Sequence, residues 1–159
     1  MDERLTNPRD TPGVIAPPPL ILLGFVLLGL ALDWLRPAAF LPSAVQYAVG
    51  AALIALALAL AAAAIVCFTR AGTNVPTRQP ATALVVAGPY RFSRNPIYVG
   101  MILLVLGIGV MVDSVWLIGL ALPFAFVLRY GVIAREERYL AAKFGDAYRA
   151  YRERVRRWL

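Results

Sequence analysis

Residues 45–68 read VQYAVGAALIALALALAAAAIVCF, and this stretch decides the fold. It contains no charged residue and is dominated by Ala and Leu. An α-helix rises ~1.5 Å per residue, so the stretch easily crosses a hydrocarbon core of ~30 Å. We therefore predict a transmembrane helix, and its small residues favour close packing against a neighbouring helix.

Three further apolar runs occupy residues 20–35, 97–112 and 115–135. The first could be a signal peptide, but the segment ahead of it is long and slightly acidic, which favours an uncleaved membrane helix. Asp113-Ser114 separates the last two runs, so we expect a tight helical hairpin with Asp113 at its water-exposed turn. The predicted fold is all-α, polytopic, with about four transmembrane helices.

Both ends of the chain differ from these runs. Residues 1–19 are polar and then proline-rich, which predicts a disordered tail ahead of a single membrane domain at 20–159. In residues 136–159, apolar side chains recur at three- and four-residue spacing between Lys and Arg. This pattern predicts an amphipathic interfacial helix on an anionic leaflet. Gly145-Asp146 can end one helix and cap another, so two helices are also allowed.

The composition supports a bilayer as the environment. The 159 residues are 60% hydrophobic and 16% charged, with a mean hydropathy of +0.70. The net charge of +7 would also fit nucleic acid, but Lys and Arg cluster between and after the apolar runs. The positive-inside rule predicts such clustering in cytoplasmic loops. We therefore expect no nucleic-acid partner, membrane lipids as partners, and both termini in the cytoplasm of a bacterial inner membrane.

Cysteine and histidine usage narrows the possible chemistry. Cys67 is the one cysteine, it lies inside an apolar run, and histidine is absent. An intrachain disulfide is therefore impossible, and neither a metal site nor histidine-based catalysis is expected.

The least hydrophobic internal stretch covers residues 69–100 and ends in a dense group of polar side chains. These are Tyr90, Arg91, Arg94, Asn95 and Tyr98. Such a group at a predicted membrane boundary is a candidate site. A local structural reading stays open, because Asn95 can accept a hydrogen bond from the start of a helix and Pro96 suits the first helical position.

A second polar group follows the fourth run at Glu136 and Glu137. Four spans bring it to the same leaflet as Asn95. Adjacent helical residues lie ~100° apart, so we expect one glutamate to face the bundle and the other to face water. The pair fits either solvated acids matched by Arg135 or Arg138, or a functional acid near membrane depth.

The stretches GPYRFSRNPIYVG and REERYLAAKFGDAYRAYRERVRRWL resemble the integral-membrane methyltransferases of the isoprenylcysteine carboxyl methyltransferase and phospholipid methyltransferase superfamily, over residues 72–159. The shared signature is Gly-x-Tyr, then Arg-(His or Asn)-Pro-x-Tyr-x-Gly opening a membrane helix, then Glu-Glu closing the next. The resemblance implies S-adenosylmethionine as methyl donor, a lipophilic acceptor that enters from the bilayer, and no Rossmann domain.

The resemblance implies a cofactor pocket, formed by the residues that match the family's motif positions. Its residues would be Gly88, Tyr90, Arg94, Asn95, Pro96, Tyr98, Gly100, Glu136 and Glu137, with Gly72 a less close match. Arg94 could pair the cofactor's carboxylate bidentately, and the glutamates could hold its hydroxyls or amine. No catalytic residue is assigned, and methyl transfer between aligned groups does not require histidine.

The acceptor stays open. Isoprenylcysteine enzymes generally carry His where this chain has Asn95, whereas the phospholipid branch accepts Asn. An isoprenylcysteine-like carboxylate, a phospholipid amine and other membrane-soluble groups all fit. Two other functions compete with methyl transfer: a non-catalytic membrane protein in which Arg94 and Glu137 form only a structural ion pair, and a transporter, for which four spans without inverted repeats give little basis.

Overall fold

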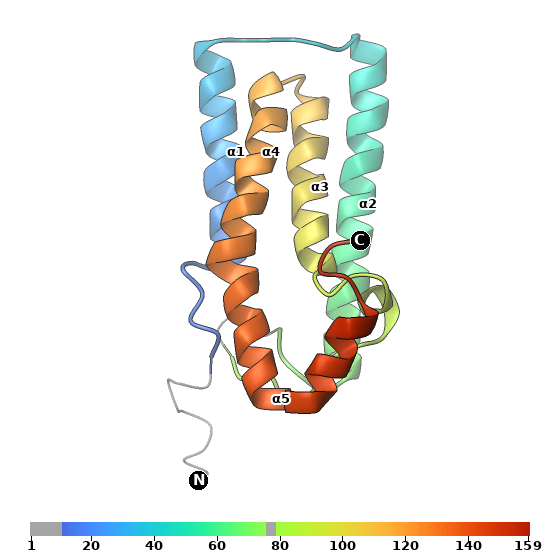
Figure 1. The fold of residues 1–159 in the computed structure, drawn as a ribbon. Helices are drawn as coiled ribbons and strands as arrows, with labels where there is room; N and C mark the ends of the chain where they lie inside the picture. Colours follow the sequence, from blue (N-terminus) through green and yellow to red (C-terminus); the bar gives the residue numbers. More distant parts are fainter. Residues whose placement is uncertain (1–10, 76–78) are drawn as a thin grey trace.

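The computed structural model describes residues 11–75 and 79–159, where every regular element is a helix. Four apolar helices stand side by side (Figure 1). They are α1 (Pro18–Leu35), α2 (Ser43–Arg70), α3 (Pro96–Met111) and α4 (Val115–Val127). The helices α1 and α2, and the long helix that begins with α4, have the length and hydropathy to cross a membrane, and α3 is a shorter apolar helix. The predicted all-α polytopic fold is confirmed, and the protein is an integral membrane protein.

Small residues bring α2 and α3 close together. The order across the bundle is α1, α4, α3, α2 (Figure 1), and α3 packs most extensively against α2. A Cβ added at Gly50 would lie 2.7 Å from the Cα of Met111, and one at Gly107 would lie 3.0 Å from the backbone nitrogen of Ile54. Glycine is therefore needed for this approach, as the small residues of α2 predicted.

The hairpin between α3 and α4 turns at Asp113, as predicted, but this residue is half-buried rather than water-exposed. Its carboxylate accepts hydrogen bonds from the backbone nitrogens of Phe40 and Leu41, at 2.9 and 3.0 Å. The side chain of Ser114 accepts one from Leu117 N and caps α4. Asp113 therefore ties the α3–α4 turn to the connection between α1 and α2.

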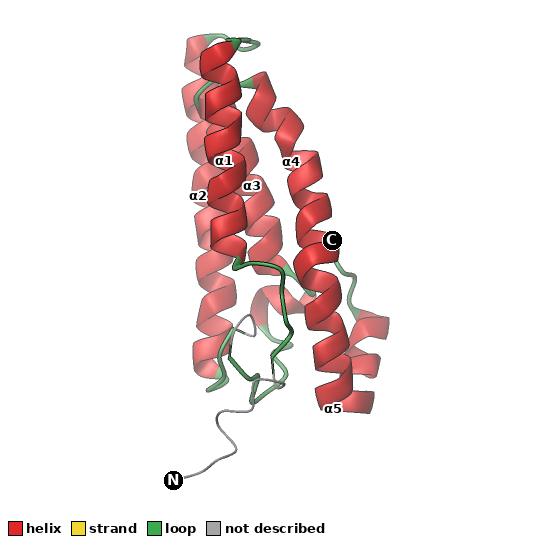
Figure 2. Cartoon of the chain, turned by 90° about the vertical axis from the view of Figure 1, so that its left-hand side faces the viewer, coloured by secondary structure: helices red, strands yellow, loops and turns green. Residues whose placement is uncertain are grey.

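The helix that begins with α4 does not end at residue 135. It continues through a π-helical segment, η3 (Leu128–Ile133), into α5 (Ala134–Arg154), and Figure 2 shows one continuous helix. The backbone of Gly145 leaves helical geometry at φ 52° and ψ −122°. The last part of α5 then turns back toward the start of α3 (Figure 1), so the alternative of two helices is confirmed.

The apolar side of the tail contacts protein. Tyr148 and Tyr151 are buried, and the Tyr151 hydroxyl donates to the carbonyl of Tyr90 at 2.7 Å. That carbonyl lies in η2 (Gly88–Arg91), the short 3-10 helix ahead of α3. The second half of α5 therefore covers the segment that leads into α3.

The chain ahead of α1 also contacts the long helix. Ile15 N donates to the carbonyl of Gly131 at 3.2 Å, and an Arg135 side-chain nitrogen donates to the carbonyl of Gly13 at 2.6 Å. Residues 1–10 of the predicted tail lie outside the described residues. From residue 11 to the start of α1 at Pro18, these contacts hold the chain against η3, which differs from the expected disorder through residue 19.

Gly50→Val should lower the thermal unfolding midpoint in detergent, because the new side chain must displace the backbone of Met111. Overpacking of this kind costs roughly 1–3 kcal/mol. Gly24→Val is the matched control, since an added Cβ there meets nothing within 4 Å. Equal unfolding midpoints for the two variants would contradict the close α2–α3 contact.

Candidate functional site

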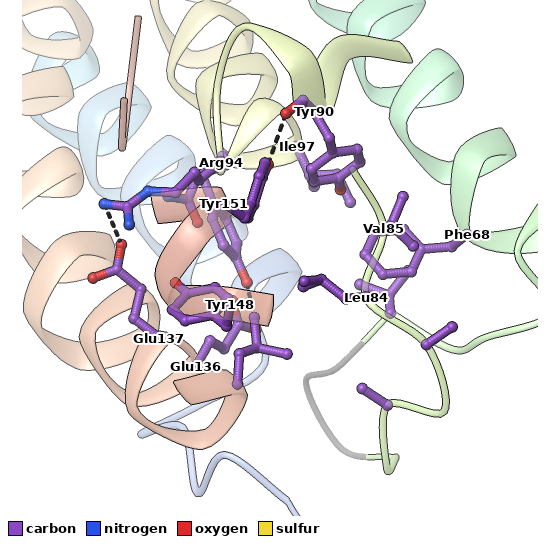
Figure 3. A pocket seen from close by; sticks show the side chains of 16 residues that line it. Phe68, Leu84, Val85, Tyr90, Arg94, Ile97, Glu136, Glu137, Tyr148 and Tyr151 are labelled. Atoms are coloured by element: carbon purple, nitrogen blue, oxygen red, sulfur yellow. Dashed lines mark hydrogen bonds and ion pairs between the residues drawn. The ribbon is translucent and has the colours of Figure 1, made fainter. Parts of the chain in front are cut away.

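One pocket gathers the polar residues that the sequence singled out. It encloses about 650 Å³ of space, open mouth included. The end of α2, the chain leading into α3, the start of α3 and both halves of α5 surround it (Figure 3). Phe68, Val85 and Leu140 contribute to its apolar lining. Arginine, glutamate and tyrosine side chains form the polar part.

Glu137 is held between two arginines. The Arg157 guanidinium donates through Nε to Oε1 at 2.9 Å and through Nη2 to Oε2 at 2.7 Å. Arg94 Nη2 lies 3.1 Å from Oε1. Only 8% of the Arg94 side chain and 14% of the Glu137 side chain are exposed, so this pair is largely withdrawn from water. The hydrogen bond with Glu137 raises the pKa of Arg157 above its ordinary value.

Two hydrogen-bond donor atoms of Arg94 are not used by the described residues. Its Nε and Nη1 atoms are buried and have no hydrogen-bond partner in the described part of the chain. Leaving charged donors buried and unpaired is costly, so such atoms call for a partner. Arg94 lines the pocket, and its guanidinium plane appears beside Glu137 in Figure 3. An oxygen of a carboxylate or phosphate in the pocket would accept a hydrogen bond from such an arginine donor.

Glu136 has a different environment from its neighbour. It is 7% exposed, and its Oε1 accepts a hydrogen bond from the Tyr98 hydroxyl at 2.8 Å. Among the ion pairs of the described residues, none involves Glu136. An acid in this position suits a cationic group of a ligand. Glu136 faces the bundle as one glutamate was expected to do.

Glu137 differs from the expectation for the second glutamate. It was expected to face water, or to pair with Arg135 or Arg138, which lie in the same helix. It instead pairs with Arg94, as the non-catalytic alternative had it, and with Arg157, and both arginines come from segments far away in the sequence. The bend at Gly145 brings the end of the chain back to the pocket, and this makes the pairing possible.

Aromatic side chains form one wall of the pocket. The rings of Phe68 and Tyr90 meet edge to face with centroids 5.4 Å apart, and those of Tyr148 and Tyr151 lie 6.3 Å apart. Burial raises the pKa of the Tyr90 phenol far above its ordinary value, so this group stays neutral. The aromatic wall offers a surface for a planar group.

Most of the predicted site residues line this pocket, namely Tyr90, Arg94, Asn95, Tyr98, Glu136 and Glu137. Gly88, Pro96 and Gly100 do not line it. Gly88 has a φ of +59°, and a Cβ there would lie 2.7 Å from the sulfur of Cys67. A Cβ at Gly100 would lie 3.0 Å from the carbonyl oxygen of Ala57. Pro96 is the buried first residue of α3, so all three shape the backbone around the pocket.

Gly72, the less close match, also lies outside the pocket lining. It has a φ of +62° and directly follows the C-cap of α2. Its carbonyl accepts a hydrogen bond from the Thr82 hydroxyl at 3.2 Å. Glycine readily adopts this left-handed conformation, so the residue serves the turn that ends the helix.

The side chain of Asn95 does not cap α3, although the local reading of the sequence expected this. Its Nδ2 donates instead to the carbonyl of Arg157 at 2.9 Å. The Ser93 hydroxyl also donates to that carbonyl, at 3.4 Å, and Arg94 N donates to the carbonyl of Arg156 at 2.9 Å. We call residues 155–159 the C-terminal strap, because these bonds fasten them across the segment ahead of α3.

Several pocket residues were not singled out from the sequence. Tyr148 and Tyr151 follow the same spacing as a membrane-facing stripe, so the pattern alone does not separate them from lipid-facing residues. Arg157, which does not line the pocket but binds Glu137, was also missed because it is one of many arginines near the chain end. The signal that could have found it is the helix break at Gly145, which allows the tail to return to the acidic pair.

The sequence matches the family described as "Phospholipid methyltransferase" over residues 45–147. The chain belongs to this family. The matched region contains α3, α4 and both glutamates, and it agrees with the resemblance drawn from the two motifs. The strap lies beyond the match to the phospholipid methyltransferase family.

Curated relatives of this family member match over shorter stretches. An uncharacterized protein of Haemophilus influenzae is 58% identical over 36 residues, which are 23% of this chain and 57% of the relative. The cobalt-zinc-cadmium resistance protein CzcN of Cupriavidus metallidurans is 44% identical over 64 residues, 40% of this chain and 29% of the relative.

The nickel-cobalt-cadmium resistance protein NccN of Alcaligenes xylosoxydans xylosoxydans is 34% identical over 74 residues, 46% of this chain and 34% of the relative. The matched stretches thus span between 29% and 57% of the length of these three relatives. No solved structure matches the chain.

Asn95→Asp should loosen the C-terminal strap, because a carboxylate cannot donate to the Arg157 carbonyl and repels it. Trypsin should then cleave at the arginines of residues 152–157 several-fold faster than in the native protein. Asn74→Asp makes the same chemical change at an exposed position and is the control. Equal cleavage rates in both variants would mean that the Asn95 amide does not hold the strap.

Proposed function

We propose that the protein transfers a methyl group from S-adenosylmethionine to a small lipophilic acceptor at the cytoplasmic face of a bacterial inner membrane. The observation that carries the proposal is that, among the described residues, two Arg94 donors have no partner and lie in the same pocket as Glu136, a buried acid with no arginine partner. One ligand with an anionic and a cationic end would pair with both Arg94 and Glu136. Membership in the phospholipid methyltransferase family supports a donor of this kind.

The residues present fit S-adenosylmethionine. Arg94 would hold the carboxylate through Nε or Nη1, the two buried atoms that need an acceptor and that face opposite sides of the guanidinium. Glu136 would stand near the amine or the sulfonium. The aromatic wall of Phe68, Tyr90 and Tyr148 would take the adenine ring.

When bound, the cofactor would supply a methyl carbon attached to a positively charged sulfur. The acceptor's lone pair would form the new bond to this carbon, and the electron pair of the broken carbon–sulfur bond would return to sulfur. The chain's part is to align the reactants and to exclude water. Burial of Arg94, Tyr98 and Glu136 serves both purposes. An acceptor that carries a proton must release it, and Glu136 is a pocket carboxyl group to which no arginine of the described segments is bound.

The side of the membrane follows from the charge distribution. Lys and Arg are concentrated between α2 and α3 and after α4, the two parts of the chain that build the pocket. The positive-inside rule places these parts in the cytoplasm. The apolar lining from Phe68, Val85 and Leu140 suits an acceptor that arrives from the bilayer.

A non-catalytic role would also include the Arg94–Glu137 ion pair. Such a role does not account for the two remaining Arg94 donors, because a structural pair is most stable when both partners are fully hydrogen-bonded. The unpaired donors therefore favour a ligand site over a purely structural pair.

Arg94→Met should weaken binding of S-adenosylmethionine and of its demethylated product by tenfold or more, because a charge-assisted hydrogen bond to the ligand carboxylate is lost. Isothermal titration of detergent-purified protein measures this. Arg91→Met is the control, since Arg91 lies in the adjacent turn and is exposed. Saturable binding that survives equally in both variants would remove Arg94 from the site.

Membranes that contain the protein should transfer tritiated methyl groups from S-adenosylmethionine into an organic-extractable product. Glu136→Gln should reduce this incorporation by at least tenfold, because a neutral amide replaces the carboxyl group that can balance a cationic end of the cofactor. Glu153→Gln removes an exposed acid from the same helix and should leave incorporation unchanged. Incorporation no higher than in membranes without the protein, despite cofactor binding, would refute methyl transfer.

A further inference from the structure

The C-terminal strap brings Arg157 to a carboxylate that Arg94 also contacts. Arg157 uses two nitrogens and occupies both oxygens of Glu137, whereas Arg94 uses one nitrogen on one oxygen. The two arginines therefore share Glu137 unequally. This sharing leaves Nε and Nη1 of Arg94 without an acceptor in the described residues.

We propose that Arg157 is a positioning residue: by occupying Glu137, it keeps the free donors of Arg94 available for the carboxylate of the bound ligand. This inference rests on the proposed function and assigns to the strap a role in ligand selection. An arginine and a carboxylate favour a bidentate fork when no other partner intervenes. Without Arg157, Glu137 would form a bidentate pair with Arg94. This pair would occupy an Arg94 donor that the ligand needs.

The strap is fixed to the same segment that carries Arg94. The carbonyl of Arg157 accepts from Asn95 Nδ2 and the Ser93 hydroxyl, and the carbonyl of Arg156 accepts from Arg94 N. Trp158 packs against the main hydrophobic core. Arg157 is thus held by the backbone on both sides of its side chain, and its side chain is only 33% exposed.

The charges define the ligand class. Two guanidinium groups and one carboxylate leave one positive charge in this cluster, which a single ligand carboxylate balances. The same ligand without its carboxylate would leave the charge uncompensated and Nε and Nη1 of Arg94 unpaired. The cluster should therefore discriminate between ligands that differ only in a carboxylate, and the discrimination should depend on Arg157.

The test compares S-adenosylmethionine with decarboxylated S-adenosylmethionine, titrated calorimetrically into the full-length protein in detergent. The native protein should prefer the carboxylated ligand by tenfold or more. Arg157→Met should reduce the affinity for S-adenosylmethionine by about tenfold and change that for the decarboxylated form by less than about twofold. Arg156→Met is the matched control, because it removes an exposed charge from the strap and keeps the backbone contact.

A double variant separates positioning from a merely structural role. Arg157→Met combined with Glu137→Gln removes the charge that would capture Arg94, so the preference for the carboxylated ligand should return. Equal weakening of both ligands in Arg157→Met, or no return in the double variant, would show that the strap only supports the fold.

Two further outcomes distinguish this inference from the proposed function. If the native protein prefers S-adenosylmethionine and Arg157→Met keeps the same preference, the positioning role is wrong while the proposed function stands. If the folded native protein binds neither ligand, the proposed function fails, and the inference fails with it.

Discussion

The carboxylate of Glu137 joins two segments that line the pocket to the C-terminal strap. It belongs to α5, and it binds Arg94 from the segment ahead of α3 and Arg157 from the C-terminal strap. An ion pair this far from water is stable only while its partners are complete, and loss of one partner typically costs about 3–5 kcal/mol. The order of the pocket therefore depends on a charge balance that a ligand carboxylate would complete.

The bilayer determines where such a cluster can form. A charged side chain in the middle of the bilayer is costly, so charged side chains gather at the ends of the bundle. Close contact through Gly50 and Gly107 holds α3 against α2, and η3 carries the chain from α4 into α5 without a break. These features place Tyr98 and Glu136 within hydrogen-bond distance although 38 residues separate them.

Apolar runs and glycine signals predicted the helices and the break at Gly145, because these features are local. The two motifs pointed to Arg94, Tyr98 and Glu136, which meet in one pocket. The bonds that Asn95 and Glu137 make to Arg157 were not predictable, since each depends on the strap returning from the far end of the chain. The periodicity of the tail could not distinguish tyrosines that cover protein from residues that cover lipid.

An experimental structure with bound S-adenosylhomocysteine tests the central claim most directly. The account predicts the ligand in the pocket between α3 and α5, with its carboxylate on Nε or Nη1 of Arg94, and with Glu137 still held by Arg157. A ligand bound elsewhere, or a pocket in which protein groups occupy those two Arg94 atoms, would contradict the account.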